Sequence, residues 1–122
     1  MSDIADEMRN QLGAHLTRAY GALVTVSLNL PVPVTLPDGV VTNMEAVPAV
    51  RRLLEIVEDQ PMPEEAQANL FAACAFWLGA EDLFRLLCTE EFNGARAHSC
   101  AANLIMTEET LEDVTNFLLG LE

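Results

Sequence analysis

The stretch NLFAACAFWLGAEDLFRLLCTEEF, residues 69–92, decides how this chain folds. Its spacing predicts an apolar helix that ends at Gly79, followed by a short amphipathic helix with apolar residues from Leu83 to Cys88. The stretch also holds the single tryptophan, Trp77. Two short helices with this much apolar surface need other segments packed around them. We therefore expect residues 69–92 to form the core.

The composition indicates one folded domain, residues 1–122, with a strongly acidic surface. The chain has 122 residues, 51% of them apolar, which is enough for one core and too little for two domains of ordinary size. Its 19 acidic residues face only 6 basic ones, for a formal net charge of −13. A field of this sign repels the phosphate backbone, so direct DNA or RNA binding is excluded. The same field favours a basic protein partner.

Cysteine usage and the start of the chain predict an intracellular protein. The three cysteines, Cys74, Cys88 and Cys100, all fall in apolar helical contexts, which is typical of buried, reduced thiols. The chain opens with acidic residues, and no apolar run approaches the roughly 20 residues that span a bilayer. We expect a soluble cytoplasmic or nuclear protein that does not associate with membranes.

The N-terminal part predicts a helix and then a strand. Apolar residues recur every three or four positions over residues 3–20, which indicates an amphipathic helix that Gly21 ends. Residues 22–30 alternate in parity and are rich in β-branched side chains, which favours a strand. A longer first helix that continues to Asn29 is the alternative reading.

Prolines mark the segment that follows. Residues 31–48 contain four prolines, a density that excludes a helix and allows edge strands at 32–36 and 40–42. The valines and leucines of this segment are too apolar to leave in water, so we expect an ordered connection. The expected fold class is mainly α with a small β component (α+β), with short strands near residues 22–42.

The second half of the chain predicts only helices. Pro63 suits a first helical turn, and Gly79 has the chemistry of a left-handed helix terminator. Thr107 can cap the last helix. The expected helices of this half are 47–59, 63–79, 81–88, 95–106 and 107–121. With the first helix, about five to six helices surround the pair in residues 69–92.

The sequence shows no catalytic constellation and no cofactor motif. Neither a GxGxxG nor a GxxxxGK[ST] pattern is present, no lysine is available to hold a phosphate, and no serine sits in a GxSxG elbow. Cys88, His98 and Cys100 match no common zinc spacing, so buried thiols and a surface histidine are favoured over a metal site. His15 is favoured as an interior or interface residue rather than a base. We expect a non-enzymatic protein without metal or cofactor.

Adjacent acids recur along the chain, and most of these pairs fall near helix starts. Carboxylates in a first turn are stabilised by the helix dipole, which explains them without a catalytic role. The acids expected to form the exposed surface are Glu64, Glu65, Glu81, Asp82, Glu108 and Glu109.

Binding of a protein partner is the function that these exclusions leave. The helix 107–121 carries an apolar stripe, which is either a contact surface for a partner or part of this chain's own core. A homodimer is compatible with either alternative. The residues predicted to contact a partner are Leu104, Ile105, Leu111, Val114, Phe117 and Leu118.

One pattern of residues resembles a known family. The spacing of Trp77-Leu78, Leu83, Leu86 and Cys88 resembles the helical pair of the Skp-type adaptors of cullin-RING ubiquitin ligases, members of the BTB/POZ fold that includes elongin C. Two further segments are similar to that family: Ala102-Asn103-Leu104-Ile105 before Thr107-Glu108-Glu109, and Pro31-Val32-Pro33-Val34. The resemblance implies an adaptor that docks on a cullin-like scaffold and presents helices 95–106 and 107–121 to an F-box-like protein.

An acidic decoy is the alternative function. A small, strongly acidic protein can occupy the basic groove of a nucleic-acid-binding protein, as phage-encoded inhibitors do, because its carboxylates imitate phosphates. The layout of charge distinguishes the two functions. A decoy should align its acids along one exposed ridge, whereas an adaptor should scatter them around apolar contact patches. The sequence favours scatter.

Overall fold

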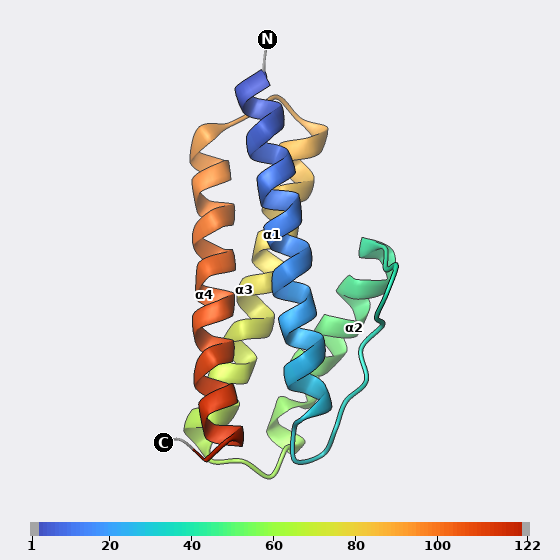
Figure 1. The fold of residues 1–122 in the computed structure, drawn as a ribbon, viewed down its shortest axis with the longest axis vertical. Coiled ribbons are helices and arrows are strands. Elements are labelled where there is room, and N and C mark those ends of the chain that lie inside the picture. The colour runs from blue at the N-terminus through green and yellow to red at the C-terminus, as the bar shows by residue number, and fades with distance from the viewer. Residues whose placement is uncertain (1–2, 121–122) are drawn as a thin grey trace.

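Three long helices lie side by side, and a shorter helix packs beside their lower half in the view of Figure 1. The structure is a computed structural model that describes residues 3–120. Its elements, in chain order, are α1 (Asp3–Leu28), α2 (Asn43–Ile56), the 3-10 turn η1 (Val57–Asp59), α3 (Glu64–Thr89) and α4 (Gly94–Leu118). Helices α1 and α4 run in the same direction, and α3 runs in the opposite one. Over residues 3–120, no helix has both the length and the apolar character needed to cross a membrane.

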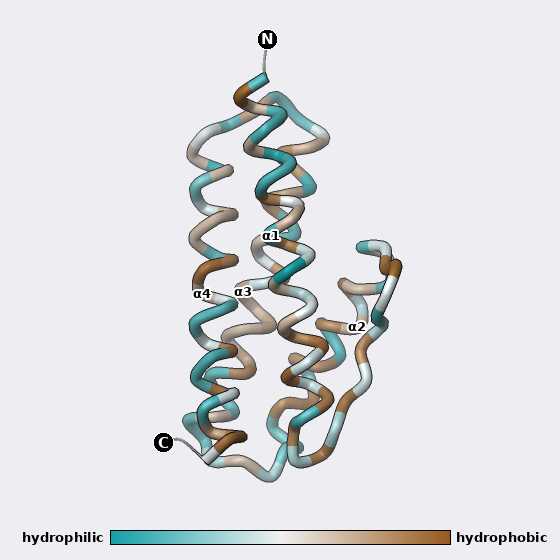
Figure 2. Tube along the Cα trace, in the orientation of Figure 1, coloured by the Kyte–Doolittle hydropathy of each residue, from teal (hydrophilic) through white to brown (hydrophobic). Residues whose placement is uncertain are grey.

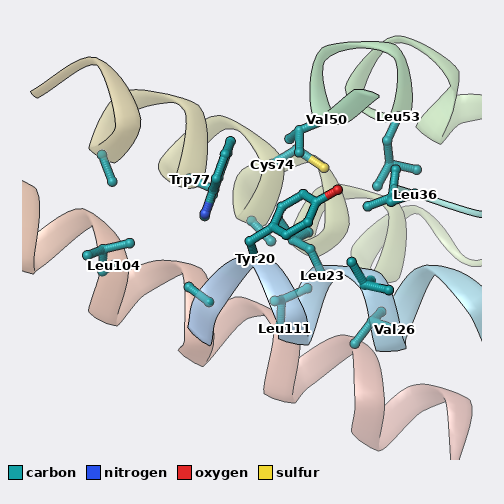
Figure 3. Close-up of a cluster of buried hydrophobic side chains, with 14 of the residues drawn as sticks. Tyr20, Leu23, Val26, Leu36, Val50, Leu53, Cys74, Trp77, Leu104 and Leu111 are labelled. Carbon is teal, nitrogen blue, oxygen red and sulfur yellow. The ribbon is translucent and has the colours of Figure 1, made fainter. Parts of the chain in front are cut away.

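Helix α3 is the centre of the molecule, because it packs against α1, α2, η1 and α4. Its tryptophan, Trp77, is 2% exposed and donates its indole N–H to the backbone oxygen of Leu16 at 3.1 Å. The Tyr20 ring lies 5.4 Å from the Trp77 ring, centroid to centroid. Figure 3 shows these two aromatic side chains among the buried residues of α1 and α4. The stretch 69–92 therefore supplies the middle of the core.

The fold is all-helical in the described residues, which makes the α+β expectation wrong. Residues 22–28 belong to α1, so the alternative of a longer first helix holds and the strand does not. Leu23, Val24 and Ser27 are all buried, and residues three and four apart share one face of a helix. The β-branched composition of this segment was outweighed by burial against the other helices.

The two expected edge strands are irregular segments without a partner strand among residues 3–120. Helix α1 satisfies part of their backbone instead. The N–H of Val34 donates to the oxygen of Ser27 at 2.9 Å, and the Tyr20 hydroxyl donates to the oxygen of Pro37 at 2.6 Å. Leu36 is 3% exposed, and Val34 and Val41 are partly buried against the core. Val32 and Val40 are exposed, so the expected burial of this segment occurs only in part.

The structure has four α-helices in the described residues where five to six were expected, because two predicted breaks do not occur. Gly79 lies inside α3, and a Cβ built on it would stand 3.2 Å from the Nδ2 of Asn103. The glycine therefore allows α4 to approach closely instead of ending a helix. Thr107 is fully buried inside α4, and its hydroxyl donates to the oxygen of Asn103 at 2.8 Å. Leu121, in the expected last helix, lies outside the described residues.

The starts of α2 and α4 each carry a capping residue. Helix α2 begins at Asn43, four residues before the expected start, although it contains Pro48. The carboxylate of Glu45 accepts from the backbone N–H of Thr42 at 3.2 Å, which is the reciprocal half of a capping box. At the start of α4, the side-chain oxygen of Asn93 accepts from the N–H of Arg96 at 3.0 Å. The Asn93 break between the helices is where the sequence predicted it.

Candidate functional site

The apolar stripe of α4 faces mainly the chain's own core. Leu104 and Val114 have no exposed surface, and Leu111 is 2% exposed. Of the residues predicted to contact a partner, only Ile105, at 48%, is exposed. The other two predicted contact residues, Phe117 and Leu118, are half-buried and pack against the core. The alternative in which this stripe packs inward therefore holds for most of its length.

A hydrogen bond between His15 and Glu108 links α1 to α4. The ring nitrogen Nε2 of His15 lies 2.8 Å from one oxygen of Glu108, and the Nε of Arg18 donates to the other oxygen at 3.3 Å. Partial burial tends to raise the pKa of the Glu108 carboxyl, but hydrogen bonds from His15 and Arg18 outweigh it and lower the pKa. Both carboxylate oxygens are thus occupied, and the arrangement is structural.

Glu81 is the one predicted surface acid that is buried, with 4% of its area exposed. Its carboxylate accepts from the Nδ2 of Asn43 at 3.3 Å and lies 3.8 Å from the Nε of Arg85. Burial, the largest cause, raises the pKa of the Glu81 carboxyl above its ordinary value. Arg85 opposes this rise, Asp82 adds to it, and Arg51 opposes it. Glu81 therefore ties the start of α2 to α3 at the cost of a buried charge.

We expect Glu81→Gln to raise the free energy of unfolding at neutral pH by about 1 kcal/mol, because the amide removes a buried charge. Because the pKa of the Glu81 carboxyl is raised in the folded state, this group contributes to the free energy of unfolding below its pKa in the unfolded chain. The contribution is lost as the pH rises through its pKa in the folded state. The increase in the free energy of unfolding that Glu81→Gln produces should therefore be absent in acid and grow towards neutral pH. Urea unfolding across this pH range measures it.

Glu109→Gln is the matched control, because it makes the same substitution at an exposed helical position that has no ion-pair partner in the described residues. We expect it to change the free energy of unfolding by less than about 0.5 kcal/mol. A loss of stability in Glu81→Gln at neutral pH, larger than that in the control, would contradict the argument from burial.

The start of α3 and the end of α4 lie at the same end of the molecule (Figure 1), and Figure 2 colours much of the α4 trace near this end as hydrophilic. Six exposed acidic residues belong to these segments and to η1. We call this set the acidic end: Glu58, Asp59, Glu64, Glu65, Glu112 and Asp113. None of these side chains lies within 4.0 Å of a basic group in the described residues. The arginines Arg9, Arg18, Arg85 and Arg96 pair with acids elsewhere. Arg51 and Arg52, in α2 shortly before η1, make no ion pair within 4.0 Å in the described residues.

A groove opens within the acidic end, between η1 and the first turns of α3. Its volume is about 600 Å³. We call it the η1–α3 groove, lined by Val57, Glu58, Glu64, Gln67, Ala68 and Phe71. Phe71 is 48% exposed, which is unusual for a large aromatic side chain. The groove thus combines an apolar ring with two carboxylates.

Two glutamines hold the wall of this groove in place. The amide of Gln67 donates to the backbone oxygens of Glu58 at 3.3 Å and Gln60 at 2.8 Å, which fastens η1 to α3. Gln60 is 4% exposed, and its amide bonds both backbone groups of Val32, at 3.0 and 2.7 Å. The position of η1 is therefore fixed from both sides.

Sequence reasoning found Glu64 and Glu65 at this end but missed Phe71 and the groove. Phe71 lies one position after the buried Leu70, and adjacent residues on a helix point some 100° apart. Adjacent positions can nevertheless both be buried, as Ala73 and Cys74 are, so the sequence held no decisive signal for the exposure of Phe71. No local signal indicated that η1 would fold back against α3.

The thiols and histidines form no site in the described residues. Burial raises the pKa of Cys74 to about 12 and, with a smaller contribution from Cys88, that of Cys100 to about 11. Cys88 is exposed, which corrects the expectation that all three thiols are buried. Over residues 3–120, no three His, Cys, Asp or Glu side chains come close enough together to hold a metal ion.

Comparisons with protein-family models, with curated proteins and with solved structures found no match to this chain. The resemblance to the Skp-type adaptors therefore stays a prediction. The geometry of the acidic end is the remaining basis for a function.

Proposed function

We propose that this chain is a non-enzymatic binding protein that occupies the basic, nucleic-acid-binding surface of a partner protein. The acidic end is the contact surface, and its carboxylates take the place of phosphates. Binding of this kind excludes nucleic acid from the partner by competition. The proposal includes an intracellular setting, which the absence of disulfides among Cys74, Cys88 and Cys100 supports.

The observation that carries the proposal is the set of six carboxylates at the acidic end, none of which has a basic group within 4.0 Å in the described residues. Arg9 pairs with Asp6 at 3.1 Å, and Arg96 lies 3.8 Å from Glu90, so part of the charge away from the acidic end is neutralised. The acidic end has no such partners in the described residues. Unpaired charges on one end produce a directed field that steers a basic partner. Exposed acids without an ion-pair partner, such as Glu7, Glu91 and Glu109, also lie elsewhere in the described residues. The proposal is therefore supported by the carboxylates of the acidic end together with the groove that opens among them.

The adaptor function is the competing proposal. It requires an exposed apolar contact surface, and Leu104, Leu111 and Val114 are buried in the core instead. The all-helical fold of residues 3–120 corrects the strands expected near residues 22–42, and the Skp resemblance stays a prediction. A basic partner is proposed from charge and does not depend on that resemblance.

The test uses the full chain immobilised on a support and exposed to a cell lysate. A variant with Glu58→Gln, Asp59→Asn, Glu64→Gln and Glu65→Gln has a formal charge of −13 + 4 = −9. We expect proteins held by the natural chain to be released by short duplex DNA and by raised salt. The variant should retain them about tenfold less, measured by quantitative mass spectrometry.

The matched control neutralises four acids at the opposite end, with Asp3→Asn, Glu7→Gln, Glu90→Gln and Glu91→Gln, and reaches the same formal charge of −13 + 4 = −9. We expect it to retain the same proteins as the natural chain. Equal retention by both variants, with no release by DNA, would rule out the decoy. If both variants retain the same proteins at raised salt, the result would support the adaptor function.

A further inference from the structure

We infer that the η1–α3 groove receives an arginine side chain of the basic partner, with the guanidinium over the Phe71 ring and between the carboxylates of Glu58 and Glu64. This inference rests on the proposed function and names the partner group that the groove selects. The phosphate-like charge of the acidic end attracts any basic surface. The groove adds a preference for arginine over lysine.

Three properties of the groove point to a guanidinium. Phe71 is 48% exposed and lines the groove, so part of its side chain is accessible to a cation. Glu58 and Glu64 line the same groove and have no basic partner within 4.0 Å among the described residues. Ala68 is exposed in the same groove and supplies apolar lining on which the aliphatic stem of the incoming side chain can pack. A planar cation that stacks on a ring and donates to carboxylates satisfies all three.

The chain already contains the contact that the groove would make with its partner. The guanidinium carbon of Arg9 lies 5.2 Å from the centroid of the Phe92 ring, and the same guanidinium bonds Asp6 at 3.1 Å. Arg9 thus lies between a phenylalanine ring and a carboxylate, and its Nε also donates to the backbone oxygen of Leu87 at 2.7 Å. In the η1–α3 groove the ring and the carboxylates are present, and the partner protein supplies the cation.

Lysine fits the groove less well than arginine for a physical reason. Its ammonium is a compact and strongly hydrated charge, whereas the guanidinium is planar, weakly hydrated and stacks on aromatic faces. A patch of carboxylates alone attracts both cations by charge. Because the guanidinium fork also suits carboxylates, the contribution of the ring is the part of the arginine preference that is lost when Phe71 is replaced by an aliphatic residue.

The test measures binding of a short peptide of alternating arginine and glycine, and of its lysine counterpart, to the full chain by calorimetry. We expect the arginine peptide to bind several-fold tighter than the lysine peptide. Phe71→Leu leaves the charge unchanged and should lower the affinity for the arginine peptide about threefold to tenfold. This loss reduces the preference for the arginine peptide over the lysine peptide. Phe71→Tyr keeps a ring and should keep the preference. Amide chemical-shift changes should centre on Gln67 and Ala68.

Phe92→Leu is the matched control, because it makes the same substitution at the opposite end, where the ring is occupied by Arg9. It should bind both peptides as the natural chain does. If Phe71→Leu leaves the preference for the arginine peptide unchanged, the groove inference is wrong. In that case, loss of peptide binding in the variant with Glu58, Asp59, Glu64 and Glu65 neutralised would still support the proposed function. If that variant also binds normally, the proposed function fails as well.

Discussion

Replacing Trp77 with alanine is expected to lower the free energy of unfolding by about 3–5 kcal/mol, the range for removing a large aromatic side chain from a core. The indole is 2% exposed, and it is the largest of the fully buried side chains. Its removal leaves a cavity between α1 and α3 and deprives the Tyr20 ring of its neighbour at 5.4 Å. Urea unfolding followed by circular dichroism measures the loss.

The effect is large because small domains have only about 5–15 kcal/mol of stability in total. Trp77→Phe is the companion variant, since it keeps an aromatic ring and removes the indole N–H that bonds Leu16 at 3.1 Å. We expect it to lose less than the alanine variant. An alanine variant as stable as the natural chain would show that α3 does not organise the core.

The second large effect distinguishes two neighbouring residues of α4 that the sequence assigned to one contact surface. Leu104 has no exposed area, whereas Ile105 is 48% exposed. We expect Leu104→Ala to cost about 2–5 kcal/mol of unfolding free energy through the cavity it leaves. Ile105→Ala should change the free energy of unfolding by about 0.5 kcal/mol or less.

The pair is informative because both substitutions remove a branched aliphatic side chain from adjacent positions of one helix. Chemical denaturation of the two variants under the same conditions provides the comparison. Similar small losses at both positions would mean that the α4 stripe is a surface, as the adaptor function requires.

The candidate site was only partly predictable, as its individual residues show. Glu64 and Glu65 were identified, because acids in the first turn of a helix are a local pattern. Glu81 was assigned to the same surface, although it is 4% exposed and bonded to Asn43. Phe71 was missed, because its exposure depends on where η1 and α2 stop covering α3. Burial of a helical residue is set by neighbours distant in sequence, which periodicity alone does not identify.

The sequence by itself determined which segments carry apolar faces, where the core stretch 69–92 lies, and that the surface is strongly acidic. These properties follow from composition and from spacing within one segment. Tertiary structure alone decided that residues 22–28 are helical and that Gly79 and Thr107 lie inside helices. Each of these positions is compatible with two local conformations of similar free energy. Packing against α3 and α4 buries apolar area in only one of them, and that burial outweighs the weak local preference.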